Sequence, residues 1–224
     1  MTGGRIILLV VGIILLLVAL GLIISGGGVL WANSCLTDDE GYYSTKTITI
    51  ERESYGITST PINIDIGLAC IWDWGNLATI KIEGLGNDPA KNIFIGVAED
   101  GEVREFFNNV EYDEVTEVNI YPNEVKYENH PGSLEPDAPI SKTFWREQVH
   151  GNGTQTLEWD IESGKWTLVI MNEDGSSGID ANVTFGAKIP WLSTVGIWLL
   201  ASGGLVLIIG LLLIVLSIRG SRQE

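Results

Sequence analysis

The clearest candidate for a chemical site is the turn NEDGSSG, which begins at Asn172 and places oxygen-bearing side chains at alternate positions. Asn172, Asp174 and Ser176 have the spacing with which a calcium-binding loop begins. The EF-hand pattern then requires glycine at its sixth position and a bidentate glutamate at its twelfth, where this chain has Ser177 and Val183. The stretch also fits a hairpin turn, because its glycines tolerate positive φ and its Asn and Asp side chains bond the turn backbone. We therefore expect a hairpin and keep these three residues as weak metal candidates, with calcium as the one cofactor to test.

Other catalytic patterns are scarce in this sequence. Glu147 and His150 have an E-x-x-H spacing, but on a strand their side chains face opposite ways and cannot share a metal. His130 stands alone before a proline, and we expect it on a loop surface. The GSSG stretch at 175–178 lacks the strand-turn-helix setting of a nucleophile elbow. The sequence has no H-E-x-x-H motif and no phosphate-binding glycine loop, so we expect no catalytic residues and no enzyme.

Acidic residues dominate the middle of the chain. Glu111, Asp113, Glu114 and Glu117 carry the oxygen ligands that a hard cation prefers, but a solvated strand and turn accounts for them without a ligand. The chain has a net charge of −16, and the part between its apolar ends holds 28 acidic and 10 basic residues, a net charge of −18. Such a surface repels nucleic acid and anionic lipid and attracts cations or basic partners. We therefore expect no nucleic-acid partner.

Cys35 and Cys70 are the only cysteines of the chain. Both lie between the apolar ends, and an even pair in an oxidising compartment suggests a disulfide. The bond would join the stretch after the first apolar segment to an early strand. The chain-entropy model gives a loop of this length roughly 3–4 kcal/mol of stabilisation. The alternative is a pair of free cysteines that pack as small hydrophobic residues.

Both ends of the chain are apolar and long enough to cross a membrane. Residues 6–24 carry no charge and extend as an uncharged stretch to Trp31, and a second uncharged segment occupies residues 191–218. A hydrocarbon core of roughly 30 Å needs about 20 apolar residues, so each segment suffices. The first segment is longer than the apolar core of a signal peptide and lacks an A-x-A cleavage site, which favours a retained helix.

Two spans place both termini on the same side of the membrane. Arg5, Arg219 and Arg222 lie in the short flanks, so the positive-inside rule predicts cytoplasmic termini, with Lys188 as a minor counter-signal. The expected segments are a cytoplasmic N-terminus at 1–5, a transmembrane helix at 6–31, an extracytoplasmic domain at 32–189, a second transmembrane helix at 190–218 and a cytoplasmic C-terminus at 219–224.

Small residues repeat every seven positions in each span. They are Gly12, Ala19 and Gly26 in the first span and Gly196, Gly203 and Gly210 in the second. A seven-residue step returns to nearly the same helix face, and antiparallel packing would set the two stripes against each other. Small residues let helices approach closely where lipid offers no hydrophobic gain, so we expect these six to form the helix interface. The alternative is chance, since glycine is common in membrane helices.

Between the spans the hydrophobic period changes to two. Alternating apolar residues occur in PINIDIGLAC, ATIKIEG, TQTLEWDI and GIDANVTFGAKI, with further candidate strands near 45–53, 91–98, 111–121, 143–149 and 165–171. This pattern predicts eight or nine short, half-buried antiparallel strands. We expect a mainly β fold, an antiparallel β-sandwich or jelly roll, between the two transmembrane helices. Residues 99–109 predict the one short helix, and 121–140 is the longest irregular stretch.

Two sequons mark candidate glycosylation sites in this domain. Asn152 precedes Gly153 and Thr154, and Asn182 lies on the polar face of its predicted strand. Either asparagine would accept a glycan only in an organism that glycosylates its envelope, and the motif has a high false-positive rate.

The C-terminal half of the chain carries an FW pair, a G-x-G-x-Q-x-L-x-W strand and a G-x-W-T-x-V-x-M-N-x-D-G hairpin before the second apolar segment. The residues of this pattern are Phe144, Trp145, Gly151, Gly153, Gln155, Leu157, Trp159, Gly164, Trp166, Met171, Asn172, Asp174 and Gly175. In these residues the chain resembles uncharacterised two-pass membrane proteins common in actinobacteria, and residues 39–59 and 93–115 resemble their N-terminal and middle segments, so the resemblance covers nearly the whole chain. The resemblance implies two helices and a β-sandwich similar to pre-peptidase C-terminal domains, and it implies no known activity. Cys35, Cys70 and the stretch 121–140 depart from the pattern.

These observations predict a non-enzymatic two-pass membrane protein of the cell envelope. It would present an acidic β-sandwich outside the cytoplasmic membrane as an interaction or accessory module, with an envelope protein, a glycan, another membrane subunit or a second copy as partner. Neither span contains an ionisable residue, which argues against ion-coupled transport. The alternative is a subunit of an oligomeric pore or channel-associated complex, in which an acidic outer domain would favour cations.

Overall fold

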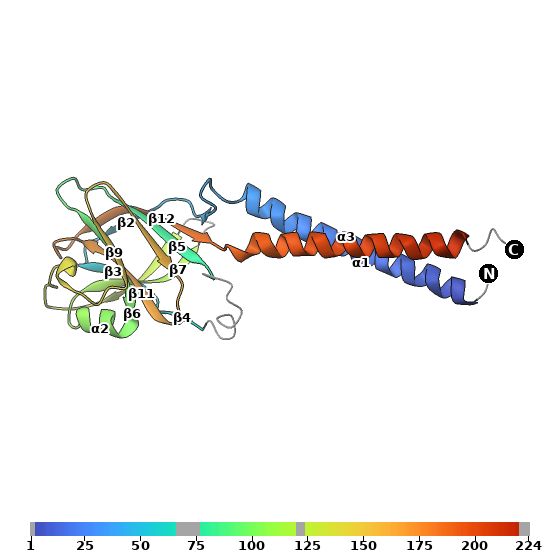
Figure 1. Ribbon diagram of the computed structural model, residues 1–224. Coiled ribbons are helices and arrows are strands. Elements are labelled where there is room, and N and C mark those ends of the chain that lie inside the picture. Colours follow the sequence, from blue (N-terminus) through green and yellow to red (C-terminus); the bar gives the residue numbers. More distant parts are fainter. Residues whose placement is uncertain (1–2, 66–76, 120–123, 220–224) are drawn as a thin grey trace. The chain divides into compact units, whose positions relative to one another are not determined.

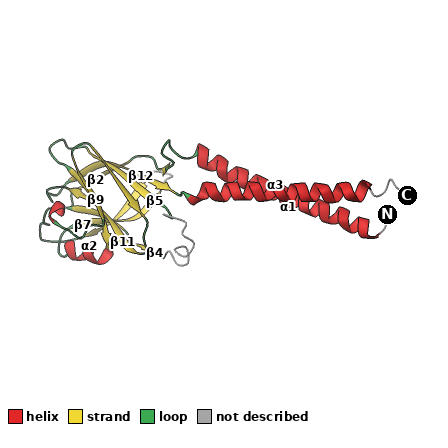
Figure 2. Ribbon diagram, viewed as in Figure 1, coloured by secondary structure: helices red, strands yellow, loops and turns green. Residues whose placement is uncertain are grey.

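The computed structural model describes residues 3–65, 77–119 and 124–219. The chain forms two compact units, one built from its two ends and one from Tyr42–Ile189, and each is described by itself. Figure 1 follows the chain from a long first helix through the strands to a long last helix, and Figure 2 shows that strands dominate its middle part. In sequence order, two long apolar helices therefore flank a β domain.

The terminal unit contains helices α1 (Gly3–Cys35) and α3 (Trp191–Arg219). At about 1.5 Å per residue, the 33 residues of α1 extend about 50 Å. The helix α3 begins directly after Pro190, a residue that lacks the N–H needed to continue a strand ladder but suits a helix start. Both helices are long and apolar enough to cross a membrane, by length and composition.

The first sheet of the β domain has five strands, and its described pairings are all antiparallel. In order they are β1 (Tyr43–Ser44), β12 (Ile179–Lys188), β5 (Thr79–Gly86) and β10 (Thr154–Asp160), and β2 (Ile48–Arg52) also pairs with β12. Strand β12 is central, since its Ala181 lies between Ile50 of β2 and Gly86 of β5. The first and last strands of the domain therefore belong to the same sheet.

The second sheet has seven strands. In order they are β8 (Glu124–His130), β7 (Tyr112–Asn119), β3 (Gly56–Ser59), β11 (Gly164–Asn172), β6 (Ile93–Glu99) and β9 (Glu147–Gly151), and β4 (Ile62–Ile64) also pairs with β11. Strands β3 and β7 run parallel, with Ile57 opposite Asp113, and the other strand pairs described in this sheet are antiparallel.

The main hydrophobic core lies between the two sheets. Ile82, Leu157 and Val183 contribute to it from the five-stranded sheet, and Ile95 and Ile170 contribute from the seven-stranded sheet. Each of these side chains is at most 2% exposed. Burying one such side chain contributes roughly 1.5–3 kcal/mol, so this shared core is the main force that holds the sheets face to face.

A second cluster covers the outer face of the seven-stranded sheet. Phe94 and Met171 of the sheet pack there against Phe107, which follows helix α2 (Asp100–Phe106), and against Trp145. Strand β6 is thus covered on both faces, which is why it appears in the sequence as a continuous apolar run. Gly96 leaves the space that these rings need, since a Cβ atom there would lie 2.8 Å from both Phe94 and Trp145.

The fold differs from the expected one in strand number and direction. The structure describes twelve strands rather than eight or nine, and the short helix expected at 99–109 is present as α2. Strand β8 lies inside the stretch 121–140, so the expectation of an irregular loop there was wrong. The parallel pair β3–β7 arises because the chain crosses the outer face of the sheet through α2 before it enters β7.

The predicted strand PINIDIGLAC is present only in part. Strand β4 covers three of its residues, and Ile62, expected on a buried face, is 49% exposed. Residues 66–70 of this predicted strand lie outside the described residues.

Candidate functional site

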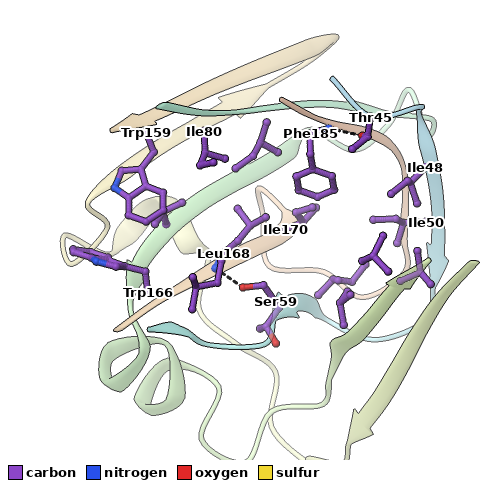
Figure 3. A pocket seen from close by; sticks show the side chains of 18 residues that line it. Thr45, Ile48, Ile50, Ser59, Ile80, Trp159, Trp166, Leu168, Ile170 and Phe185 are labelled. Atoms are coloured by element: carbon purple, nitrogen blue, oxygen red, sulfur yellow. Dashed lines mark hydrogen bonds between the residues drawn. The ribbon is translucent and has the colours of Figure 1, made fainter. Parts of the chain in front are cut away.

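A cavity of about 390 Å³ lies between the two sheets. Figure 3 shows side chains from both sheets pointing into it, and those labelled are Thr45, Ile48, Ile50, Ser59, Ile80, Trp159, Trp166, Leu168, Ile170 and Phe185. Sites for small organic molecules typically have volumes of roughly 300–1,000 Å³ and are lined mainly by hydrophobic and aromatic side chains with a few polar groups. In size and lining, this cavity fits an apolar ligand.

Three hydroxyl-bearing residues, Thr45, Thr58 and Ser59, lie among these apolar side chains, and the backbone holds two of them. The Phe185 backbone N–H donates to Thr45 Oγ1 at 3.1 Å, and the Leu168 backbone N–H donates to Ser59 Oγ at 3.0 Å (Figure 3). A hydroxyl group has one donor proton in addition to its acceptor lone pairs. The backbone therefore fixes both oxygens, and each O–H can still donate to a ligand.

Trp159 also lines the cavity, but its indole nitrogen has almost no accessible surface there. The residue is 4% exposed, and its indole Nε1 has no hydrogen-bond partner among the described residues. The neighbouring Trp166, whose ring centroid lies 5.5 Å away, donates its indole N–H to the Glu162 carbonyl at 3.1 Å. Buried tryptophan N–H groups usually find an acceptor. The Trp159 N–H is therefore left without an acceptor among the described residues and does not open on the cavity.

A second cleft, of about 250 Å³, is polar and lies beside α2. His130 Nε2 lies 3.2 Å from Glu114 Oε2, and its ring stacks on Tyr112 with a centroid distance of 4.5 Å. His130 ends strand β8, so the expectation of a loop position was wrong. Burial, followed by the negative charge of Glu114, raises the pKa of Tyr112. The phenol therefore stays protonated at neutral pH, which does not suit a nucleophile or a general base.

Asp100 lines the same cleft and is almost fully buried. Lys165 Nζ lies 2.7 Å and Arg104 Nε lies 3.0 Å from its Oδ2. Burial alone would raise the pKa of Asp100, but the hydrogen bonds from Lys165 and Arg104 outweigh it and lower the pKa below its ordinary value. The carboxylate is thus ionised and paired. Such an arrangement stabilises the fold rather than activating a nucleophile.

Asp113 belongs to the acidic group that the sequence analysis interpreted as a solvated strand. Its side chain is instead buried, with Arg52 donating to both carboxylate oxygens at 2.7 and 2.8 Å. Ser54 Oγ and Asn129 Nδ2 donate to it as well. Burial would raise the pKa of Asp113, but these hydrogen bonds and the charge of Arg52 hold it below its ordinary value. The solvated interpretation was wrong for Asp113, which links β2 to β7.

The other members of that acidic group make pairs of their own. Glu114 contacts His130 as described, Lys126 Nζ lies 2.6 Å from Glu117 Oε2, and Glu111 accepts a hydrogen bond from Asn129. Among the described residues, no group of three or more His, Cys, Asp or Glu side chains is arranged to hold a metal ion.

The turn between β11 and β12 contains the three calcium candidates. Asn172 Nδ2 donates to the carbonyls of Ser176, Ser177 and Gly178 at 2.8, 3.2 and 3.1 Å. The Ser176 backbone N–H donates to Asp174 Oδ1 at 2.9 Å, a bond that lowers the pKa of this carboxyl. The structure therefore brings the three residues together as a closed turn, in which Asn172 presents its N–H₂ group to the turn carbonyls.

A lysine from another loop completes this turn. Lys91 Nζ donates to the carbonyls of Ser177 at 2.6 Å and Gly178 at 3.1 Å. Gly175 and Gly178 both have a φ of +77°, a backbone conformation that favours glycine. The carbonyl oxygens of Ser176, Ser177 and Gly178 are thus engaged by internal donors, and the geometry is that of a hairpin. It gives the calcium hypothesis no support.

The two sequons differ in their surroundings. Asn152 is exposed in the turn between β9 and β10. Asn182 is half-buried on β12, where its Nδ2 donates to Asn87 and its Oδ1 accepts from Thr49, both at 2.7 Å. A glycan is attached at this amide nitrogen, so modification of Asn182 would compete with the bond to Asn87. Asn152 is the better acceptor, and its glycosylation stays a prediction.

Cys35 is the last residue of α1 and is exposed. Cys70, its predicted disulfide partner, lies outside the described residues. The disulfide therefore stays a prediction.

The small-residue stripes lie between α1 and α3. The buried residues of α1 are Gly12, Ala19 and Gly26, and those of α3 are Gly196, Gly203, Gly210 and Ser217. A Cβ atom at Gly26 would lie 2.8 Å from the Gly196 carbonyl oxygen, and one at Gly12 would lie 3.0 Å from the Gly210 carbonyl oxygen. The backbones thus approach as closely as glycine permits.

Ser217 is a further interface residue that was not predicted, although it continues the seven-residue step that begins at Gly196. Ser217 is fully buried, and its Oγ donates to the Arg5 carbonyl at 2.9 Å. The grouping of Thr45, Ser59 and Trp159 around the cavity had no sequence signal, because it depends on which strands the fold brings together.

No family model matches this sequence, and no curated protein matches it. The resemblance to two-pass membrane proteins of actinobacteria therefore stays a prediction.

Proposed function

We propose that this protein is a non-enzymatic two-pass membrane protein of the cell envelope. Its helix pair anchors an acidic β-sandwich, which acts outside the cytoplasmic membrane as an accessory binding module. The observation that carries this proposal is the close packing of α1 against α3 at the small residues of both helices. Close packing at small residues holds helices together in lipid, where burial of apolar surface provides little driving force.

The outward-facing side chains of the two helices support the membrane assignment. Between the buried stripes, large apolar residues are exposed along both helices, among them Leu17 and Leu205. Trp31 and Trp198, which are 64% and 71% exposed, lie toward the predicted outer ends of the spans, where indole rings favour the membrane interface. A helix pair with this surface is stable in lipid and would aggregate in water.

The β domain supports a binding role rather than catalysis. Its apolar cavity has the size and lining of a ligand site, whereas the charged groups of the polar cleft pair with one another. The module is therefore expected to hold a ligand or a partner without changing it chemically.

Labelling of single cysteines tests the topology. In a chain carrying Cys35→Ser and Cys70→Ser, Gly101→Cys and Gly4→Cys would each introduce a thiol where an added Cβ meets no neighbour. We expect a membrane-impermeant maleimide to label Gly101→Cys in intact cells and to label Gly4→Cys only after permeabilisation. The reverse pattern would overturn the proposed orientation.

Purification of the full chain from native membrane in mild detergent tests the accessory role. We expect a monomer or dimer that carries an envelope partner with it. A closed ring of three or more chains that conducts cations after reconstitution would instead establish the pore subunit.

A further inference from the structure

We propose that the cavity between the two sheets binds a single hydrocarbon chain whose head is an uncharged oxygen acceptor, such as the ester carbonyl of a membrane lipid. This inference goes beyond the proposed anchoring role, because it assigns a ligand class to a site in the β domain.

The body of the cavity selects an apolar chain. Most of the lining consists of Ile, Val, Leu, Phe and Trp side chains, and Ile80, Phe185 and Leu168 enclose its middle from opposite sheets (Figure 3). An engineered apolar cavity of roughly 150 Å³ already takes up benzene, and this one is more than twice as large. A flexible hydrocarbon chain can fill such an irregular space and removes its own surface from water at the same time.

The polar groups of the lining select an acceptor. The oxygens of Thr45 and Ser59 each accept one backbone N–H, which leaves their O–H groups able to donate to a ligand. Thr58 brings a third hydroxyl group to the lining. A carbonyl or ether oxygen satisfies such donors, whereas a ligand that carries only N–H groups does not.

The head group is expected to be uncharged. None of the described residues that line the cavity is an Asp, Glu, Lys, Arg or His. A carboxylate or phosphate would therefore be buried without a counter-charge, which is strongly unfavourable. The net charge of −18 between the helices also repels anions as they approach. An ester meets the donors without either penalty.

The membrane is the expected source of this ligand. Phe185 of β12 forms part of the cavity lining, and the chain enters α3 only six residues later, at Trp191. The strand that carries one wall of the cavity thus continues directly into a predicted span. This step rests on the proposed membrane anchoring, whereas the fit of an apolar chain to the cavity does not.

Photolabelling of the full chain tests the proposal. The protein would be reconstituted in lipid nanodiscs with a small amount of the methyl ester of a diazirine-bearing palmitic acid, irradiated and digested for peptide mass spectrometry. We expect labelled peptides from β5, β11 and β12. Labels confined to α1 and α3 would show contact with bilayer lipid only and would overturn the proposal.

The free acid serves as the charged comparison at pH 7.5, and equal labelling of the β strands by the acid would overturn the assignment of an uncharged head.

Two filling variants and one matched control complete the experiment. Ile80→Trp places a larger ring in the cavity, and Val118→Trp does so at a lining position that is 46% exposed and tolerates a larger side chain. Leu85→Trp is the control, since Leu85 lies on the same strand as Ile80 but is 39% exposed and does not line the cavity. We expect each filling variant to lower labelling of the β strands at least fivefold and the control to leave it unchanged. Unchanged labelling in a folded Val118→Trp protein would overturn the proposal.

Discussion

At the scale of single residues, the buried carboxylate of Asp113 is expected to stabilise the fold through its charge. Asp113→Asn keeps the size of the side chain but removes the charge that pairs with Arg52. We expect the free energy of unfolding to fall by about 1–3 kcal/mol, because an amide at this buried position cannot accept all the hydrogen bonds that Arg52, Ser54 and Asn129 donate to the carboxylate. Urea denaturation of the full chain in detergent, followed by tryptophan fluorescence, measures this change.

Asp137→Asn is the matched control for that variant. Asp137 also pairs with a cation, Lys142, at 2.6 Å, but its side chain is 76% exposed. Surface pairs contribute at most about 1 kcal/mol, so a much smaller loss is expected. Equal losses in Asp113→Asn and Asp137→Asn would contradict the importance of burial.

The same carboxylate predicts how stability depends on pH. The folded pKa of Asp113 is lowered, so on acidification the unfolded chain takes up this proton before the folded chain does. Its contribution is fully present above the unfolded value of about 3.9 and is lost as the pH falls through the lower, folded pKa. We expect the denaturation midpoint to fall below about pH 4 in the natural protein and to fall less steeply in Asp113→Asn. Parallel curves for the two proteins would count against this assignment.

At the scale of elements, the helix pair gives the most direct prediction. A Cβ atom at Gly203 would lie 2.8 Å from Ile23 Cγ1 and 3.1 Å from the Ile23 backbone nitrogen. Gly203→Leu therefore forces α1 and α3 apart, and overpacking of this kind costs about 1–3 kcal/mol. Spin labels at the exposed positions Ile14 and Leu212, in a background without native cysteines, should report a longer and broader distance distribution.

Gly204→Leu is the control for this prediction, since no neighbour lies within 4 Å of a Cβ atom at Gly204. It adds the same side chain one residue away, where the added Cβ atom would meet open space. The distance distribution should match that of the unsubstituted helices. A comparable broadening in both variants would mean that helix propensity, and not packing, determines the effect.

Elements with a strong local pattern could be predicted from the sequence. Ile48 and Ile50 alternate with polar residues and form β2, and the uncharged ends form helices. Strand β8 was missed because its inward residues, Val125 and Tyr127, lie among charged neighbours and are only half-buried. The parallel pairing of β3 with β7 had no local signal, since it depends on the path of the chain across the sheet.

The site was less predictable than the fold for a physical reason. Arg52 and Asp113 are 61 residues apart, and nothing in either neighbourhood shows that they meet. The cavity likewise depends on spaces between side chains from both sheets, which no single strand pattern encodes. By contrast, the turn at Asn172 was predictable as a hairpin, because its glycine and asparagine chemistry is local.

At the scale of the whole molecule, the predicted disulfide would tie the anchor to the domain. If Cys35 bonds to Cys70, the intact mass of unreduced protein after alkylation should show no added label, and reduction should allow two. Chain entropy predicts a loss of roughly 3–4 kcal/mol in the free energy of unfolding on reduction. Two alkylated thiols in native, unreduced protein would exclude the bond.

The pairing of β2 with β12 affects how the protein is made. Thr49 lies opposite Asn182, so the five-stranded sheet cannot close until nearly the whole domain has been synthesised. At roughly 5–20 residues per second, translation leaves the early strand unpaired for on the order of ten seconds. During that interval its open edge can pair with other chains. The last strand is followed at once by α3, so completion of the sheet and arrest of export at the second span are nearly simultaneous events in the life of the nascent chain.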